Sequence, residues 1–184
     1  DEFYKNTRNF INLDKNSNIL EIGCNDCYLL NKYKTHTKNL YGIDASKKMV
    51  DYSRKKYKLK VFHNLFDSKI VKFFLSKKIK FKIIIANNVF NHMNNPNLCL
   101  KNIYKVLDTN GVFIFEVPYW LDTIKSMRYD QIYHEHVTYF TLQSAYNLLK
   151  KNDFNIELVS IENYHGKSLR IIAKKKYTGL NLKF

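Results

Sequence analysis

Apolar residues occur along the chain in short runs that alternate with amphipathic stretches. The runs are rich in β-branched and aromatic residues and end at glycine, proline or polar residues, which is typical of strands. In the stretches between them, Ser46, Pro96 and Thr141 are favourable first residues for helices. The pattern predicts strands at 18–23, 40–44, 59–62, 81–86, 111–117, 154–161 and 168–174. It predicts helices at 1–10, 27–33, 46–57, 67–75, 96–107 and 141–151.

Strands that alternate with helices form parallel sheets with helices on both faces. The sequence therefore predicts an α/β, Rossmann-like fold with a mostly parallel sheet of seven strands. No helix is predicted between the last two strands, so these should form an antiparallel hairpin at one edge. A turn is expected at 108–111, before the fifth strand. Since no repeat or linker interrupts the pattern, we expect residues 1–184 to form a single domain.

The three cysteines imply no disulfide framework. Cys24 and Cys27 form a C-x-x-C motif, which is typical of redox pairs and of zinc sites. No second motif of this kind occurs in the sequence, so we interpret the two cysteines as small side chains that fill a tight turn, and we expect no metal site. No apolar run approaches the roughly 18 residues of a membrane span, and no signal-peptide pattern is present. The expected location is the cytoplasm.

The chain carries a formal net charge of +15. Such a charge can indicate a polyanionic partner such as RNA or DNA. Here the lysines are dispersed along the whole chain, which favours a compositional origin, and we expect no nucleic-acid partner. A moderate positive field also suits a small substrate that carries a diphosphate.

The segment Glu21-Ile-Gly-Cys-Asn-Asp26 follows the first predicted strand. In open α/β sheets, ligands bind at the carboxyl ends of strands, and Gly23 lets a ligand approach the backbone. The further glycines of a dinucleotide site are missing, and two acids oppose a pyrophosphate. The acids suit a sulfonium or an amine, and Asp44 at the end of the next strand suits a ribose diol. S-adenosylmethionine has all three groups and is the predicted cofactor; acids that only cap helices are the alternative.

The segment 129–140 concentrates proton-handling side chains, since Tyr133, His134, Glu135 and His136 are consecutive. Clustered titratable groups are typical of functional sites, although a single His–Glu pair can also be structural. The cluster indicates a site that removes a proton and stabilises the charge left behind. Adjacent residues of an extended segment point in opposite directions, so we do not expect His134, Glu135 and His136 to converge on a metal.

Five motifs occur in order along the chain: Glu21-Ile-Gly-Cys-Asn-Asp26, Asn87-Asn-Val-Phe-Asn-His92, Glu116-Val-Pro-Tyr119, Asp130-Gln-Ile-Tyr-His-Glu-His136 and His165-Gly-Lys-Ser-Leu-Arg170. Together they resemble the S-adenosylmethionine-dependent C-methyltransferases that act on nucleotide-linked keto-sugars in deoxysugar biosynthesis. The resemblance implies a class I methyltransferase fold. It also implies a reaction in which a base removes the proton next to the sugar ketone and the resulting enolate takes the methyl group.

The resemblance implies roles for individual residues as well. His136 is the expected base, Glu135 and Tyr133 orient it or bind the sugar, and His92 assists at the ketone. Cofactor contacts are expected from Glu21, Gly23, Asn25, Asp26, Asp44, Asn87 and Asn88. Substrate contacts are expected from Tyr119, His165, Lys167 and Arg170.

The sequence departs from the family pattern at two positions. Cys27 replaces the usual glycine after the acid of the first turn, and Lys167 replaces the second glycine of His-Gly-Gly. Full-length relatives carry a zinc-binding N-terminal region and a further C-terminal domain, which we do not expect in this chain. The segment 165–170 is also compatible with a plain hairpin turn at Gly166, with Lys167 or Arg170 facing a substrate diphosphate as the other interpretation.

Two other functions are compatible with the sequence. An RNA or protein methyltransferase would account for the positive charge, but such a substrate rarely needs a base for a carbon acid. A cofactor-binding remnant without catalysis is the second alternative.

Overall fold

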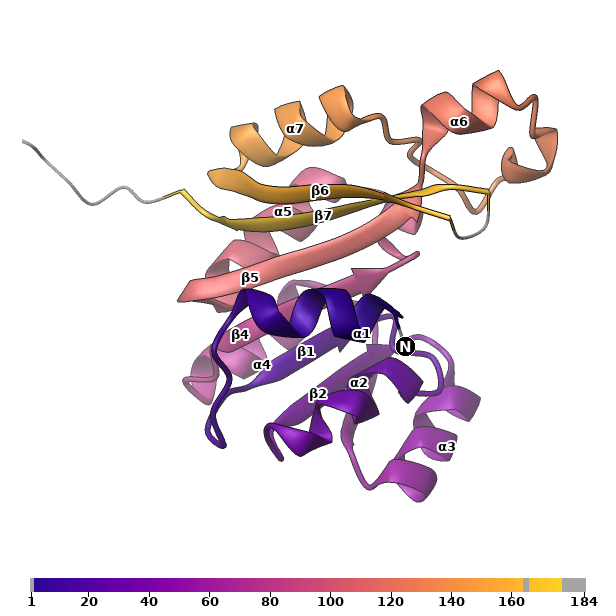
Figure 1. The fold of residues 1–184 in the computed structure, drawn as a ribbon. Helices are drawn as coiled ribbons and strands as arrows, with labels where there is room; N and C mark the ends of the chain where they lie inside the picture. Colours follow the sequence, from indigo (N-terminus) through magenta and orange to yellow (C-terminus); the bar gives the residue numbers. More distant parts are fainter. Residues whose placement is uncertain (1, 164–165, 177–184) are drawn as a thin grey trace, which may run out of the picture.

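The computed structural model describes residues 2–163 and 166–176. Its centre is a seven-stranded sheet in the order β3-β2-β1-β4-β5-β7-β6 (Figure 1). The strands are β1 (Ile19–Ile22), β2 (Leu40–Asp44), β3 (Lys60–His63), β4 (Phe81–Asn87), β5 (Leu107–Pro118), β6 (Phe154–Glu162) and β7 (Ser168–Lys175). The first five strands are parallel, while β7 runs antiparallel to both β5 and β6. The predicted fold class and the edge hairpin are thereby confirmed.

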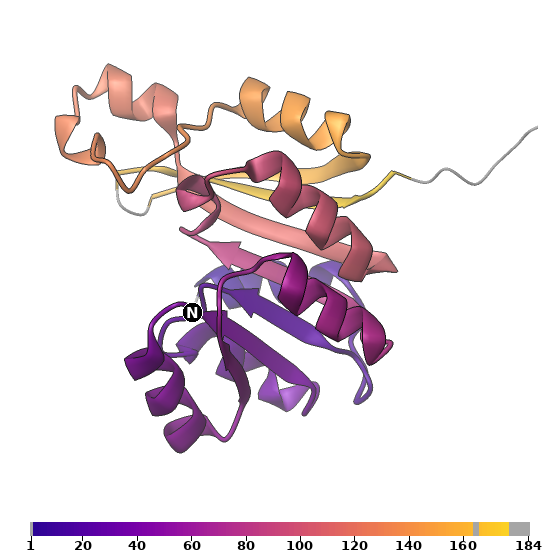
Figure 2. The ribbon, with the colours of Figure 1, turned by 180° about the vertical axis from the view of Figure 1, so that it is seen from behind.

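Helices cover both faces of the sheet. The face towards the viewer in Figure 1 carries α1 (Glu2–Thr7), α2 (Tyr28–Lys32) and α3 (Lys47–Tyr57). The opposite face, seen in Figure 2, carries α4 (Ser68–Ser76), α5 (Pro96–Val106) and α7 (Leu142–Lys151). None of the helices in the described ranges combines the length and apolar character that a membrane crossing requires.

The helix boundaries follow from capping side chains. The Ser46 hydroxyl accepts from the Met49 amide, Asp67 accepts from the Lys69 and Ile70 amides, and Thr141 forms a reciprocal capping box with Ser144. These contacts satisfy amide groups that the first turn of a helix leaves without a partner. The predicted helix starts at 46, 67 and 141 are correct to within one residue for this reason.

Strand β5 shows how the two cores are separated. Val112 and Ile114 belong to the core under α1 and α2, while Phe113, Phe115 and Val117 belong to the core under α5 and α7. This alternation is what a strand buried on both faces requires. The larger core contains a group of aromatic rings in edge or stacked contact: Phe90, Phe113, Phe115 and Phe140.

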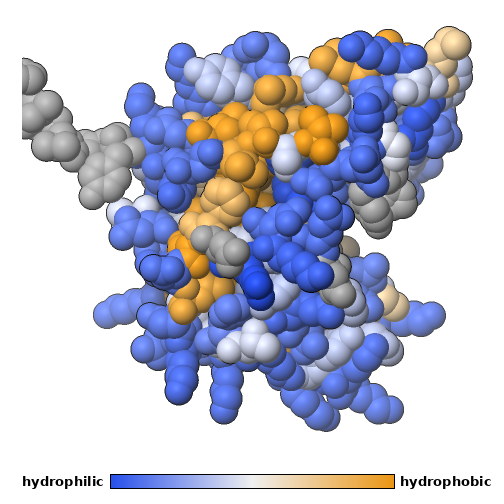
Figure 3. All heavy atoms as spheres, viewed as in Figure 1, coloured by the Kyte–Doolittle hydropathy of each residue, from blue (hydrophilic) through white to orange (hydrophobic). Residues whose placement is uncertain are grey.

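Helix α1 has only six residues and leaves part of the sheet uncovered on its own side. Figure 3 shows apolar side chains gathered on this face beside α1. Phe10, Leu158 and Ile172 line a shallow cavity there, and Leu158 is 36% exposed.

Two local features differ from the prediction. The turn expected at 108–111 is wrong, because these residues belong to β5. Phe81 pairs with Leu107 and Ile83 with Val112, so residues 108–111 bulge opposite the single residue between Phe81 and Ile83. Helix α6 (Trp120–Lys125) and a 3-10 helix at Tyr129–Gln131 were not predicted. Neither has a capping side chain, so their sequence signal is weak.

Candidate active site at the carboxyl edge of the sheet

The strand order reverses between β1 and β4, which is where open α/β sheets bind ligands. The turn after β1 begins at Gly23, which has a φ of +66°. A Cβ atom at this position would lie 2.2 Å from Cγ2 of Val89. Both the backbone conformation and the lack of space therefore require glycine.

Asp44 holds the first turn in place. One oxygen of its carboxylate accepts from the Asn25 amide at 2.8 Å, and the other accepts from the Ser46 amide at 2.8 Å. The side chain thus connects the turn after β1 to the start of α3. It remains partly exposed and lines a cavity, so its oxygens can accept further hydrogen bonds from a ligand.

We call this space the α4-side cavity. It has a volume of about 670 Å³, in the range of small-molecule sites. Gly23 and Asp44 form one wall, and His92 forms part of the rim. The other lining residues come mainly from the loop before α4 and from the start of α5: Asn64, Leu65, Phe66, Asp67, Met93, Asn95, Leu98, Cys99 and Asn102.

The two acids of the first turn have partners within the chain. Glu21 is buried, and its carboxylate accepts from the Leu30 amide at 3.1 Å, which fastens α2 to β1. Burial raises the pKa of Glu21 well above its ordinary value. Asp26 accepts from the Tyr28 amide at the start of α2. Neither acid lines the α4-side cavity, so the structure gives both a supporting role beneath or beside it.

Cys24 and Cys27 are buried free thiols. A Cβ atom at Gly42 would lie 2.7 Å from the Cys24 sulfur and 3.3 Å from the Cys27 sulfur, so both thiols fill the space above Gly42. The Cys24 thiol donates a hydrogen bond that lowers the pKa of Cys27. In the part of the chain that the structure describes, no group of three or more His, Cys, Asp or Glu side chains is placed to hold a metal ion.

The central motif is a turn rather than the extended segment that we expected. The His136 amide donates to the Tyr133 carbonyl at 3.0 Å, which places these two side chains on the same side. The Tyr133 hydroxyl lies 2.7 Å from Nε2 of His136, and Nδ1 of His136 lies 2.9 Å from the Gln131 carbonyl. A carbonyl can only accept, so neutral His136 carries its proton on Nδ1. Its Nε2 is then the acceptor, and Tyr133 is the donor.

The two side chains of this pair differ in exposure. His136 is only 8% exposed, whereas Tyr133 is 41% exposed. Loss of solvation is the main cause that lowers the pKa of His136, which keeps the ring neutral and able to accept a proton near pH 7. The Tyr133 hydroxyl is therefore the outer end of a short chain that leads to a buried base.

His92 connects this pair to the α4-side cavity. Its ring centre lies 5.0 Å from that of His136, and its Nδ1 lies 2.7 Å from the Glu135 carbonyl. As for His136, the carbonyl requires a proton on Nδ1 and leaves a lone pair on Nε2 of the neutral ring. The Glu135 carboxylate is exposed, so the contribution of Glu135 to this geometry is its backbone oxygen.

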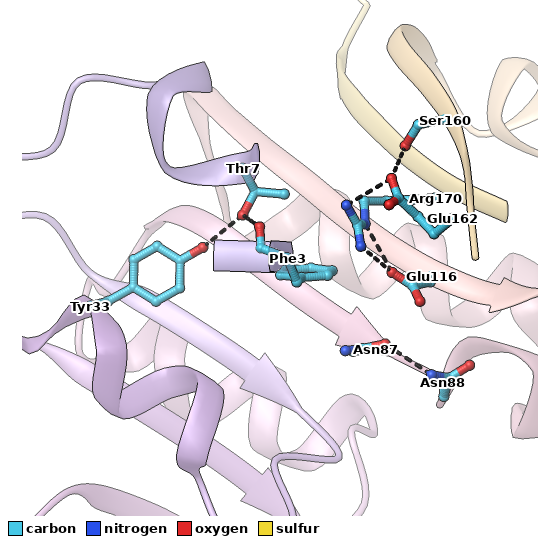
Figure 4. Close-up of polar contacts among 9 residues, drawn as sticks. All are labelled: Phe3, Thr7, Tyr33, Asn87, Asn88, Glu116, Ser160, Glu162 and Arg170. Atoms are coloured by element: carbon cyan, nitrogen blue, oxygen red, sulfur yellow. Dashed lines mark hydrogen bonds and ion pairs between the residues drawn. The ribbon is translucent and has the colours of Figure 1, made fainter. Parts of the chain in front are cut away.

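A second polar cluster lies at the ends of β5, β6 and β7 (Figure 4). Arg170 donates through Nε and Nη2 to one carboxylate oxygen of Glu116, each at 2.8 Å, and through Nη1 to Glu162 at 2.8 Å. The Arg170 side chain is 5% exposed, so its charge is neutralised inside the protein. Arg170 is therefore poorly placed for the diphosphate contact that the sequence suggested.

The remaining predicted residues are spread around this edge. Asn87 lies at the end of β4, and Asn88, with a φ of +51°, donates its side-chain amide to Asn87. Tyr119 precedes α6, and its amide donates to the Lys167 carbonyl. The Lys167 ammonium pairs with Asp122 at 3.2 Å and is half-exposed. His165 lies outside the described residues. None of these observations shows ligand contact, so their roles stay predictions.

Sequence reasoning missed two residues of the second cluster as site residues, Glu116 and Glu162. Glu116 stood inside a motif that carried the resemblance, but its partner is 54 residues away. The available signal was that Glu116 is a charged residue in an otherwise apolar strand. A charged side chain in a buried strand needs a partner of opposite charge. The Gln131 carbonyl, which fixes the His136 tautomer, carries no sequence signal at all.

A family model described as a methyltransferase domain matches residues 2–159. The chain belongs to the methyltransferase domain family. A putative S-adenosylmethionine-dependent methyltransferase from Listeria monocytogenes has the same fold, with a TM-score of 0.71 at 16% identity over 94% of this chain and 97% of that one. The fold is that of class I methyltransferases. Family and fold are thus those of methyltransferases, and the Listeria protein with this fold is described as dependent on S-adenosylmethionine.

Two curated relatives are similar over about half of the chain. C-methyltransferase NovU from Streptomyces niveus is 28% identical over 92 residues, which is 50% of this chain and 22% of NovU. Ubiquinone biosynthesis O-methyltransferase from Pelagibacter ubique (strain HTCC1062) is 31% identical over 101 residues, which is 53% of this chain and 40% of that enzyme. The match thus spans less than half the length of either relative.

The residues of the α4-side cavity fit this cofactor. The cavity offers a carboxylate for a diol at Asp44 and a backbone without a side chain at Gly23, and it is lined mainly by apolar atoms. A nucleoside needs these features: acceptors for its hydroxyls, close backbone approach and apolar walls for its base. The acidic residues on the cavity also suit the positive charge of a sulfonium ion.

Proposed function

We propose that the chain transfers a methyl group to a carbon atom next to the ketone of a nucleotide-linked keto-sugar. The observation that carries this proposal is the Tyr133–His136 pair beside a histidine that lines the cofactor cavity. A carbon next to a ketone is nucleophilic only after it loses a proton, so this reaction needs a base beside the methyl donor. The resemblance to sugar C-methyltransferases and the similarity to NovU point to the same reaction.

The geometry supports a proton relay. The Tyr133 oxygen takes the proton from the substrate carbon while its own hydroxyl proton passes to Nε2 of His136. The C–H bond is broken, its electron pair forms the enolate, and His136 becomes an imidazolium. The Gln131 carbonyl, which already accepts from Nδ1, stabilises that cation. His136 is thus the final base, as the sequence suggested, and Tyr133 is the group that meets the substrate.

In this proposal, His92 assists at the ketone oxygen in one protonation state only. Because Nδ1 donates to Glu135, neutral His92 has only a lone pair at Nε2. Protonated His92 can donate from Nε2 and stabilise the developing oxyanion. Bound S-adenosylmethionine supplies the electrophilic methyl group that the enolate carbon takes.

For the rest of the substrate, the exposed cation of Lys167 is the better candidate for a diphosphate contact. Its partner Asp122 competes, but such exposed pairs are weak and exchange readily. The substrate partner remains a nucleotide-linked keto-sugar in this proposal, with no nucleic acid.

A second candidate is O-methylation, which the similarity to the ubiquinone biosynthesis O-methyltransferase favours. The same Tyr133–His136 pair could remove a proton from an acidic hydroxyl. The two candidates differ in whether a carbon-bound or an oxygen-bound hydrogen is replaced.

The test uses thymidine diphosphate-linked 4-keto-6-deoxyglucose in deuterated water, with mass spectrometry of the sugar. With S-adenosylhomocysteine bound, the wild type should exchange a hydrogen next to the ketone, and with S-adenosylmethionine it should methylate that carbon. His136→Asn and Tyr133→Phe should lower both rates by about 10²–10⁴-fold, as loss of a general base does.

Matched controls are available in the same loop. His134→Asn and Tyr129→Phe make the same chemical changes at exposed side chains, and both rates should stay close to wild type. Equal rates in His136→Asn and His134→Asn would contradict the proposed base. Methylation of a catechol without carbon-bound exchange of the keto-sugar would instead support O-methylation.

A further inference from the structure

A second cavity lies on the other side of the sheet edge, next to α1. This α1-side cavity has a volume of about 400 Å³. Its polar lining includes Asn87, Glu116, Glu162 and Arg170 from the strand ends, with Lys32 and Tyr28 on the α2 wall. None of the roles described above accounts for a cavity with so many charged groups.

Glu116 is the central residue of this cavity. It is 2% exposed, and Arg170 occupies only one of its two carboxylate oxygens. Figure 4 shows the other oxygen without a marked contact, on the side of Asn87. Among the described residues, that oxygen has no hydrogen-bond partner, and it is not one of the fully enclosed atoms without a partner, which are on Asn91 and Asn102. It therefore opens into the α1-side cavity.

The charges of the cluster leave an excess of one carboxylate. Arg170 is a single cation between Glu116 and Glu162. Since a buried carboxylate that is only partly neutralised attracts cations, the free oxygen of Glu116 is suited to an ammonium group. Lys32 also lines the cavity, and its ammonium lies over the Tyr28 ring, 4.6 Å from the ring centre.

The two cavities lie on either side of the reversal point of the sheet. The register pairs Glu21 with Ile85, so β1 and β4 end side by side: Gly23 follows the last residue of β1, and Asn87 is the last residue of β4. Gly23 lines the α4-side cavity and Asn87 lines the α1-side cavity. A ligand whose nucleoside fills the first cavity can thus extend past these strand ends into the second.

We propose that Glu116, held by Arg170, binds the α-ammonium of the amino-acid end of S-adenosylmethionine in the α1-side cavity. Asn87, opposite Glu116 in the register of β4 and β5, adds a side-chain amide beside it. This inference rests on the cofactor and not on the identity of the methyl acceptor.

The test compares two ligands by titration calorimetry. S-adenosylhomocysteine has the amino-acid end, whereas 5′-methylthioadenosine has the same nucleoside without it. Glu116→Gln should weaken S-adenosylhomocysteine binding by about 10- to 100-fold, the usual effect of losing a charge-assisted hydrogen bond. Binding of 5′-methylthioadenosine should be unchanged, which also reports that the variant is folded.

A second variant covers the case in which Glu116→Gln does not fold. Glu116→Asp keeps the charge but withdraws the carboxylate by one methylene, and it should reduce the preference for S-adenosylhomocysteine in the same direction. If both variants kept the wild-type preference for S-adenosylhomocysteine over 5′-methylthioadenosine, the proposal would be overturned. An equal loss of affinity for both ligands would also overturn it, because it would indicate a structural role for Glu116. If the wild type bound neither ligand, the cofactor assignment itself would be wrong.

Discussion

The two polar clusters at the carboxyl edge of the sheet are built in opposite ways. Glu116, Glu162 and Arg170 come from three different strands, and hydrogen bonds from the buried Arg170 hold the other two side chains. Tyr133 and His136 come from one turn, and the Tyr133 side chain is 41% exposed. The first cluster is part of the framework, whereas the second can be changed with little effect on the fold. Substitutions in the first cluster should therefore mainly lower the stability of the fold, and substitutions in the second should mainly lower the reaction rate.

The largest effect is expected at Arg170. Arg170→Met leaves the buried Glu116 and the partly buried Glu162 without their cation and should lower the free energy of unfolding by about 3–5 kcal/mol. Urea denaturation measures this change. Lys174→Met is the matched control on the same strand, because Lys174 pairs with Glu157 at 3.2 Å on the surface. The control should lose less than about 1 kcal/mol, and equal losses would show that the buried cluster is not a framework element.

Tyr133→Phe should have a smaller effect on stability. It removes one hydrogen bond at a partly exposed side chain, so the free energy of unfolding should fall by about 0.5–1.5 kcal/mol. The same urea titration measures it. A loss as large as that of Arg170→Met would mean that the turn is a structural element and would weaken its assignment to catalysis.

The smallest expected effect is on the pH dependence of stability. Because the pKa of His136 is lowered in the folded protein, the unfolded chain takes up the proton first as pH falls. The stability that neutral His136 contributes is complete above about pH 6.5, the ordinary value for histidine, and is lost as pH falls towards the folded pKa. The wild type should thus lose more stability than His136→Asn between pH 8 and pH 5.5, measured as the shift in urea midpoint. An identical pH dependence would contradict the lowered pKa.

Features that depend on neighbouring residues were predictable from the sequence. The strands and caps follow local patterns, and Tyr133 and His136 stand three residues apart, so their cluster was visible without a fold. The wrong prediction at 108–111 has a physical reason, since a bulge in a strand has the same polar, glycine-containing sequence as a turn.

Contacts between side chains that are distant in the sequence were not predictable. Glu116 and Arg170 are in contact because β7 lies between β5 and β6 in the sheet. Arg170, which we expected to contact a substrate diphosphate, is therefore paired with carboxylates inside the protein. The tautomers of His92 and His136 depend on two backbone carbonyls, whose positions are set by the turn rather than by any side chain.

The most direct test of this account is a crystal structure of the complex with S-adenosylhomocysteine. We expect the nucleoside in the α4-side cavity with its ribose hydroxyls on Asp44, the amino-acid end in the α1-side cavity with its ammonium on Glu116, and the sulfur facing Tyr133 and His92. A complex in which the ligand occupies only one cavity would contradict the proposal that one cofactor molecule extends through both cavities, and a sulfur that faces away from Tyr133 would contradict the proposed site of methyl transfer.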